Sequence, residues 1–152
     1  MTKQLKAKIT DVTVSAVGQK PFYDGVVAHL SSDDTISVFN SDRYIIFPGF
    51  CDVHVHFREP GFSYKETVKT GCDAAAHGGY TAVCTMPNLN PVPDSVENLK
   101  AQTDIIGSDA TINVYPYASI TVGQKGEELS DMQGMTENCF AFSDDGRGVQ
   151  SE

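Results

Sequence analysis

The chain of 152 residues is long enough to form one domain of ordinary size with a buried core. Hydrophobic residues make up 40% of it and charged residues 20%, which is typical of a soluble globular protein and excludes a disordered one. The formal net charge of −9 disfavours nucleic acids and anionic membrane surfaces as partners, and requires that any anionic ligand be held by a local cation.

The sequence contains no segment that predicts membrane insertion or secretion. No apolar run approaches the ~20 residues needed to cross a bilayer, and the N-terminus lacks the continuous apolar stretch of a secretory signal. We therefore expect a cytoplasmic protein. In a reducing compartment the four cysteines, which show no C-x-x-C spacing, are interpreted as small buried hydrophobic residues.

The first third of the sequence predicts a few antiparallel strands. Residues 4–17 and 23–40 alternate polar with apolar side chains, are rich in β-branched residues, and are separated by turn residues. From Tyr44 the pattern changes to a long apolar run, IIFPGFCDVHVHF, which indicates a strand buried on both faces.

Helices and strands alternate through the rest of the chain. The first helix is predicted to begin at Ser63, because Ser63 and Glu66 form a capping box, and the second at Asp94, which is followed by Glu97. Helices are expected at residues 63–77, 94–106 and 127–135, and strands at residues 80–86, 111–118 and 139–142. This order predicts parallel strands joined by crossover helices, as in the beginning of a doubly wound sheet or of a (β/α)₈ barrel.

Two histidines on the first long strand are candidate metal ligands. Successive strand residues point to opposite faces, so His54 and His56 share one face, while Val53, Val55 and Phe57 lie on the other. Two imidazoles that project together can bind one divalent cation, such as Zn²⁺. The alternative is that each is a hydrogen-bonded core histidine. His29 and His77 are interpreted as structural residues.

Polar residues follow each predicted strand at its carboxyl end. They are Arg58, Asn88, Ser119 with Thr121, and Asp144 with Asp145. Barrel enzymes build their active sites at this rim. Arg58 can hold a carboxylate through two hydrogen bonds, unless it pairs with Glu59 or Asp52 on the surface, and Asn88 is either a ligand-binding amide or a turn residue. One of the two aspartates is a candidate third metal ligand.

Four segments together resemble the dihydroorotases of the bacterial long-chain type, in the amidohydrolase superfamily. They are PGFCDVHVHFREPG, GGYTAVCTMPNLNPVPDS, PYASITVGQKGEELSD and AFSDDGRGVQ, which occur in the family's order over roughly residues 47–152. The arginine after H-x-H, the M-P-N and the P-Y-A-S-I-T distinguish this family from its hydantoinase and allantoinase relatives.

The resemblance implies a fold, a reaction and roles for five residues. The fold is α/β, with a small β-sandwich domain contributed by residues 1–46 and the first half of a (β/α)₈ TIM barrel in residues 47–152. The reaction is the zinc-dependent, reversible cyclisation of N-carbamoyl-L-aspartate to dihydroorotate in pyrimidine synthesis. His54, His56 and Asp145 would bind Zn²⁺, and Arg58 and Asn88 would bind the substrate carboxylate.

The family continues through four more strands, which carry further metal-binding histidines and the general base. We therefore expect an N-terminal fragment that has no catalytic residue of its own, is inactive alone and associates as a homo-oligomer or through open barrel edges. The alternatives are a related cyclic amidohydrolase acting on a hydantoin or allantoin, and a catalytically silent half-barrel that binds metal or serves in assembly.

Overall fold

The structure, a computed structural model, describes residues 13–14, 45–46 and 49–150, and side chains only in the last of these ranges. The chain divides into two compact units, Met1–Pro48 and Gly49–Glu152. In the first unit β1 (Thr13–Val14) pairs in parallel with β2 (Ile45–Ile46). The expected antiparallel strands, the β-sandwich and His29 otherwise lie outside the described residues, so the β-sandwich remains a prediction.

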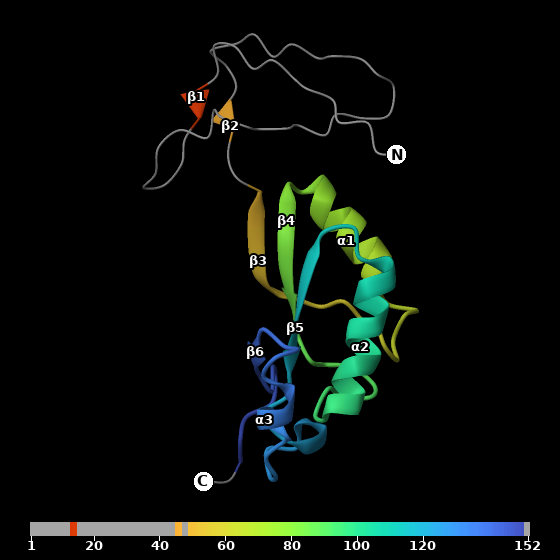
Figure 1. The fold of residues 1–152 in the computed structure, drawn as a ribbon, viewed down its shortest axis with the longest axis vertical. Coiled ribbons are helices and arrows are strands. Elements are labelled where there is room, and N and C mark those ends of the chain that lie inside the picture. The colour runs from red at the N-terminus through yellow and green to blue at the C-terminus, as the bar shows by residue number, and fades with distance from the viewer. Residues whose placement is uncertain (1–12, 15–44, 47–48, 151–152) are drawn as a thin grey trace. The chain divides into compact units, whose positions relative to one another are not determined.

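The second unit is an α/β layer built on four parallel strands, as predicted. The strands run in the order β3, β4, β5, β6, and α1 and α2 lie on the same side of them (Figure 1). The strands are β3 (Phe50–Val55), β4 (Tyr80–Thr85), β5 (Asn113–Ala118) and β6 (Ala141–Phe142). The helices are α1 (Val68–His77), α2 (Val96–Asp109), the 3₁₀ turn η1 (Val122–Gln124) and the short α3 (Met132–Met135).

The sheet is curled, so that its two edge strands approach each other at their carboxyl ends. Strands are about 4.8 Å apart, so the edges of a flat four-stranded sheet lie about 14 Å apart. Here the His54 imidazole, on β3, lies 3.3 Å from the carboxylate of Asp145, which follows β6. Neighbouring strands in chain order, helices on one side and this curvature are together consistent with part of a TIM barrel.

The core lies between the sheet and the helices. Phe57, Val68, Cys72 and Val83 form one buried cluster, and a second cluster comprises Leu99, Ala118 and Met135. Helix α1 approaches the Phe57 ring so closely that a Cβ on Gly71 would lie 2.2 Å from a ring carbon. Only glycine fits at this contact. No helix among the described residues is both long and apolar enough to span a bilayer.

Helix α1 begins four residues later than predicted, at Thr67 and not at Ser63. Thr67 accepts a hydrogen bond from the Thr70 backbone N–H, and the Thr70 hydroxyl accepts one from Thr67 in return, at 3.1 Å. The Glu59 carboxylate accepts a further bond from the Val68 N–H at 2.8 Å. The Thr67 hydroxyl and the Glu59 carboxylate thus provide acceptors for two backbone N–H groups of the first turn, which is why the helix begins here and not at Ser63.

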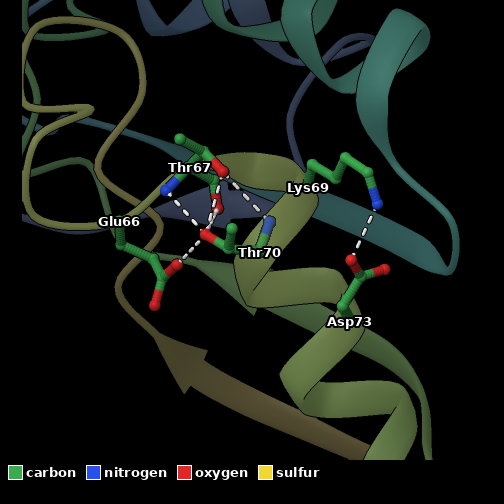
Figure 2. Close-up of polar contacts among 5 residues, drawn as sticks. All are labelled: Glu66, Thr67, Lys69, Thr70 and Asp73. Carbon is green, nitrogen blue, oxygen red and sulfur yellow. Dashed lines mark hydrogen bonds and ion pairs between the residues drawn. The ribbon is translucent and has the colours of Figure 1, made fainter.

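Figure 2 shows the polar contacts at this helix start. The Thr70 hydroxyl also donates to Glu66, the residue that was expected to complete the earlier capping box. One turn further on, Lys69 forms an exposed ion pair with Asp73 at 2.7 Å. Tyr64 precedes the helix and is 79% exposed.

The other two helices also differ from the prediction. Ser95 caps α2 by accepting from the Asn98 N–H, whereas Asp94 accepts from the Asn98 side chain and from the Gly123 N–H, each at 2.8 Å. Residues 127–131 are not helical, and α3 begins only after Asp131, which accepts a bond from Gly134. A local capping pattern does not reveal that an acidic side chain such as Asp94 accepts hydrogen bonds from two different segments.

The run from Tyr44 is not one strand buried on both faces. Ile45–Ile46 pairs with β1, whereas β3 begins at Phe50 in another sheet, and Pro48, which lacks a backbone N–H, separates the two in the sequence. Phe50 is 54% exposed and Val53 57% exposed. The reason is that β3 is an edge strand of the described sheet, a position that apolar composition alone does not reveal.

Candidate metal centre

Strand β3 presents His54 and His56 at its carboxyl end. Their rings are 5.3 Å apart, edge to face. Alternation places the neighbouring Val55 and Phe57 in the helix-covered core instead. Between Asp52 and Val55 the strand carries one residue more than the facing part of β4, and the Asp52 carboxylate accepts a hydrogen bond from the His54 N–H at 3.0 Å. This irregularity fixes the end of the strand from which both histidines project.

Asp145 faces both histidines from the loop after β6. One carboxylate oxygen lies 3.3 Å from His54 Nε2 and the other 3.5 Å from His56 Nε2. One donor atom from each of the three residues lies within 4.8 Å of the others. Two ligands bound at about 2.1 Å to a tetrahedral ion are about 3.4 Å apart, so the donor set and its spacing fit a zinc-sized cation. The side chains are 53%, 35% and 22% exposed for His54, His56 and Asp145, which leaves the site accessible.

The surroundings of His56 favour the neutral imidazole. Burial lowers its pKa below the ordinary 6.5, as does the nearby Arg58 guanidinium, while Asp145 acts in the opposite direction. Its Nδ1 is buried without a hydrogen-bond partner among the described residues. Because metal ions bind imidazole in its neutral form, a lowered pKa keeps His56 available as a ligand.

The two adjacent aspartates have different roles in the geometry. Asp144 is buried, 5% exposed, and its carboxylate accepts hydrogen bonds from the backbone of Ile120 and Thr121 and from the Thr121 hydroxyl. It points to the loop after β5, and only Asp145 reaches the histidines. The sequence left these alternatives open because strand alternation alone does not say which side chain turns inward.

Arg58 and Asn88 lie beside this cluster. The Asn88 side chain donates to the Asp145 backbone carbonyl at 2.8 Å, and its own oxygen is buried without a partner among the described residues. Arg58 Nη1 lies 3.5 Å from the Asn88 carbonyl, at the limit of a hydrogen bond. Within the described part of the chain Arg58 forms no ion pair with Asp52 or Glu59, the surface alternative that the sequence allowed.

The remaining rim residues do not face the cluster. Ser119 and Thr121 are buried: the Ser119 hydroxyl donates to the Thr121 carbonyl, and the Thr121 hydroxyl donates to Asp144 and accepts from the Gly126 N–H. His77 is exposed at the end of α1. Sequence reasoning missed the role of Asp94, which joins the start of α2 to η1. Its position next to Ser95 favoured a simple cap, and nothing in the local pattern indicates the distant partner.

Comparisons with known proteins identify the family of this chain. The dihydro-orotase-like family profile matches residues 43–152. The dihydroorotase of Fusobacterium nucleatum subsp. nucleatum is 64% identical over 115 residues, which cover 76% of this chain and 27% of the relative. Those of Staphylococcus aureus and Enterococcus faecalis are each 53% identical over 117 and 119 residues, covering 76% and 78% of this chain and 28% of each relative.

The chain therefore spans little more than a quarter of the length of these curated relatives. The match nevertheless includes every residue of the His54, His56 and Asp145 cluster as well as Arg58 and Asn88, all of which lie within residues 43–152. A profile match over this much of the chain, together with identities above 50%, shows the family. The chain belongs to the dihydroorotase-like family.

Proposed function

We propose that this chain supplies the first metal ligands and the substrate-carboxylate site of a dihydroorotase. That enzyme interconverts N-carbamoyl-L-aspartate and dihydroorotate, a step of pyrimidine synthesis, and we place it in the cytoplasm. The observation that carries the proposal is the convergence of His54, His56 and Asp145 from opposite edges of one curled sheet. Structural polar residues have no reason to converge in this way at the carboxyl ends of parallel strands.

In this proposal the three side chains bind Zn²⁺. Two imidazole nitrogens and a carboxylate oxygen form the kind of donor set that zinc takes in catalytic sites, where three protein ligands leave a position open. When bound, the ion supplies a Lewis acid that polarises a carbonyl and lowers the pKa of water. The chain's own residues provide the ligand geometry, and burial together with the positive charge of Arg58 lowers the pKa of His56, which favours its neutral form.

Arg58 and Asn88 are proposed to bind a carboxylate of the substrate. N-carbamoyl-L-aspartate is a dianion, and the net charge of −9 means that only a local cation can attract it. Arg58 provides that cation beside His56, with a guanidinium that matches a carboxylate through two hydrogen bonds. Asn88 adds a second donor hydrogen on Nδ2, whose first is used by the Asp145 carbonyl. The proposal assigns the general acid–base role to no residue of this chain.

The metal part of the proposal is tested by zinc binding to the 152-residue chain. We expect near-stoichiometric zinc after dialysis, and loss of that zinc in the His54→Ala, His56→Ala and Asp145→Asn variants. His77→Ala is the matched control, because it removes an exposed histidine on α1 and is expected to leave zinc unchanged. Zinc that survives all three ligand variants, or a wild-type chain that binds none, would contradict the proposed centre.

The substrate part is tested by calorimetric titration of the zinc-loaded chain with N-carbamoyl-L-aspartate. Arg58→Ala is expected to weaken binding at least tenfold, since it removes the charged partner of a carboxylate. Arg147→Ala, which removes an exposed arginine two residues after Asp145, is the control. Equal affinities in the two variants would contradict the assignment of Arg58. Preference for a neutral hydantoin or allantoin would instead indicate a related cyclic amidohydrolase. A chain that binds zinc but none of these substrates would be a catalytically silent half-barrel.

A further inference from the structure

Asp144 is the second acidic side chain next to the metal centre, and no metal-binding or substrate-binding role accounts for it. It is 5% exposed, whereas its neighbour Asp145 is 22% exposed and faces the histidines. A carboxylate taken out of water costs free energy unless hydrogen-bond donors replace the water. A buried aspartate beside a ligand therefore requires an explanation in its contacts.

Three donors from the loop after β5 satisfy the Asp144 carboxylate. Oδ1 accepts from the Ile120 N–H at 2.9 Å and from the Thr121 N–H at 3.2 Å, and Oδ2 accepts from the Thr121 hydroxyl. In the described part of the chain no lysine, arginine or histidine pairs with it. The contacts thus bind one loop to another, and the residues involved are 23 and 24 positions apart in the sequence.

The backbone on both sides of Asp144 is held as well. The Ser143 N–H donates to the Ala118 carbonyl of β5 at 2.9 Å, and the Asp145 carbonyl accepts from Asn88 at 2.8 Å. Strand β6 itself is only two residues long, so the ladder of the sheet fixes little of this segment. Three of the hydrogen bonds that position residues 143–145 are made by the side chain of Asp144 alone.

We infer that Asp144 is a positioning residue, which holds Asp145 against the two histidines by anchoring the segment after β6 to Ile120 and Thr121. The same contacts remove Asp144 from competition for the metal, so that one of two adjacent carboxylates becomes the ligand. This inference rests on the proposed metal centre. Groups that orient metal ligands typically contribute about 10–100-fold to metal affinity.

The test uses Co²⁺ as the probe, because its visible absorption reports the geometry of its ligands as well as its occupancy. Asp144→Asn keeps the shape of the side chain but replaces an acceptor by a donor, and Thr121→Val removes the hydroxyl that binds Oδ2. We expect both variants to bind Co²⁺ about 10–100-fold more weakly, with an altered spectrum at saturation. Thr121→Ser retains the hydroxyl and is expected to restore wild-type affinity and spectrum.

Controls separate positioning from general loss of stability. Asp104→Asn removes an exposed carboxylate on α2 that is not part of the contacts of Asp144. It is expected to leave the Co²⁺ affinity and spectrum unchanged. Folded Asp144→Asn and Thr121→Val proteins with wild-type Co²⁺ affinity and spectrum would overturn the inference. If Asp144→Asn does not fold, equal Co²⁺ binding by Thr121→Val and Thr121→Ser would overturn it. A wild-type chain that binds no Co²⁺ would contradict the metal centre itself.

Discussion

The helix-covered face of the sheet and the rim at the carboxyl ends of its strands are held together by different interactions. On the covered face Phe57, Val68 and Val83 pack as one apolar cluster. At the rim, Asn88 donates to the Asp145 carbonyl, 57 residues away, and the Asp144 carboxylate accepts from the Ile120 N–H, 24 residues away. The comparison teaches that apolar packing builds the layers of this fold, whereas polar contacts between loops determine where the candidate ligands meet.

The largest expected effect comes from opening the covered face. Phe57 is 6% exposed and fills the space against Gly71 of α1. Phe57→Ala removes a buried aromatic ring and is expected to lower the free energy of unfolding by about 3–5 kcal/mol. The measurement is chemical denaturation followed by circular dichroism.

Phe50→Ala provides the matched control, because Phe50 is a phenylalanine at the other end of the same segment, in β3, but is 54% exposed. Its substitution is expected to change stability much less, since little area is removed from water in the folded state. Equal losses in the two variants would mean that the core does not lie between the sheet and the helices.

A smaller effect is expected from the rim, where Asp94 is the anchor between the start of α2 and η1. Asp94→Ala leaves the Gly123 N–H and the Asn98 amide without their acceptor. Hydrogen bonds to a charged group contribute about 1.5–3 kcal/mol, and we expect a loss in this range by denaturant titration. Glu97→Ala, an exposed acid in the first turn of the same helix, is the control. A loss no larger than that of Glu97→Ala would show that the loop contact contributes nothing.

The smallest effect is expected at the exposed surface of α1, outside both regions. Lys69 lowers the pKa of Asp73 below its ordinary 3.8 through a hydrogen bond and charge. A lowered carboxyl pKa gives stability that is present above pH 3.8 and is lost as the pH falls through the folded-state pKa. Lys69→Met is expected to raise the Asp73 pKa, measured by NMR, with a barely detectable change in stability, because ion pairs at the exposed surface contribute little.

The corresponding pair on α2, Lys100 and Asp104, serves as an internal reference in the same spectra. The chemical shifts of both residues are expected to be the same in the wild type and in Lys69→Met. An Asp73 pKa that does not change in Lys69→Met would mean that the ion pair of Figure 2 is not populated in solution.

The difference between the two regions also explains what the sequence could predict. Alternating strands and helices, the parallel sheet and the shared face of His54 and His56 follow from local periodicity and short connections. The helix starts at Thr67 and Ser95 were placed wrongly, because two polar residues compete for each cap and only tertiary contacts decide. Exposure of Val53 was missed because apolar composition does not identify an edge strand.

For the candidate site, too, local sequence patterns predicted the region but not the long-range contacts. A polar residue after each strand was enough to predict that Arg58, Asn88 and an aspartate would gather at one rim. The sequence pattern did not decide between Asp144 and Asp145 as the ligand, because that choice depends on hydrogen-bond donors from the loop after β5. Long-range hydrogen bonds leave no periodic signal, so the side chain that turns inward is known only once the loops are placed.

X-ray absorption at the zinc edge of the zinc-loaded chain tests the metal centre most directly, because the four cysteines of the chain offer an alternative set of ligands. With His54, His56 and Asp145 as ligands we expect nitrogen and oxygen neighbours at about 2.0–2.2 Å, with the outer-shell scattering of two imidazoles. A sulfur neighbour at about 2.3 Å, or an absence of imidazole scattering, would contradict the assignment of these three residues.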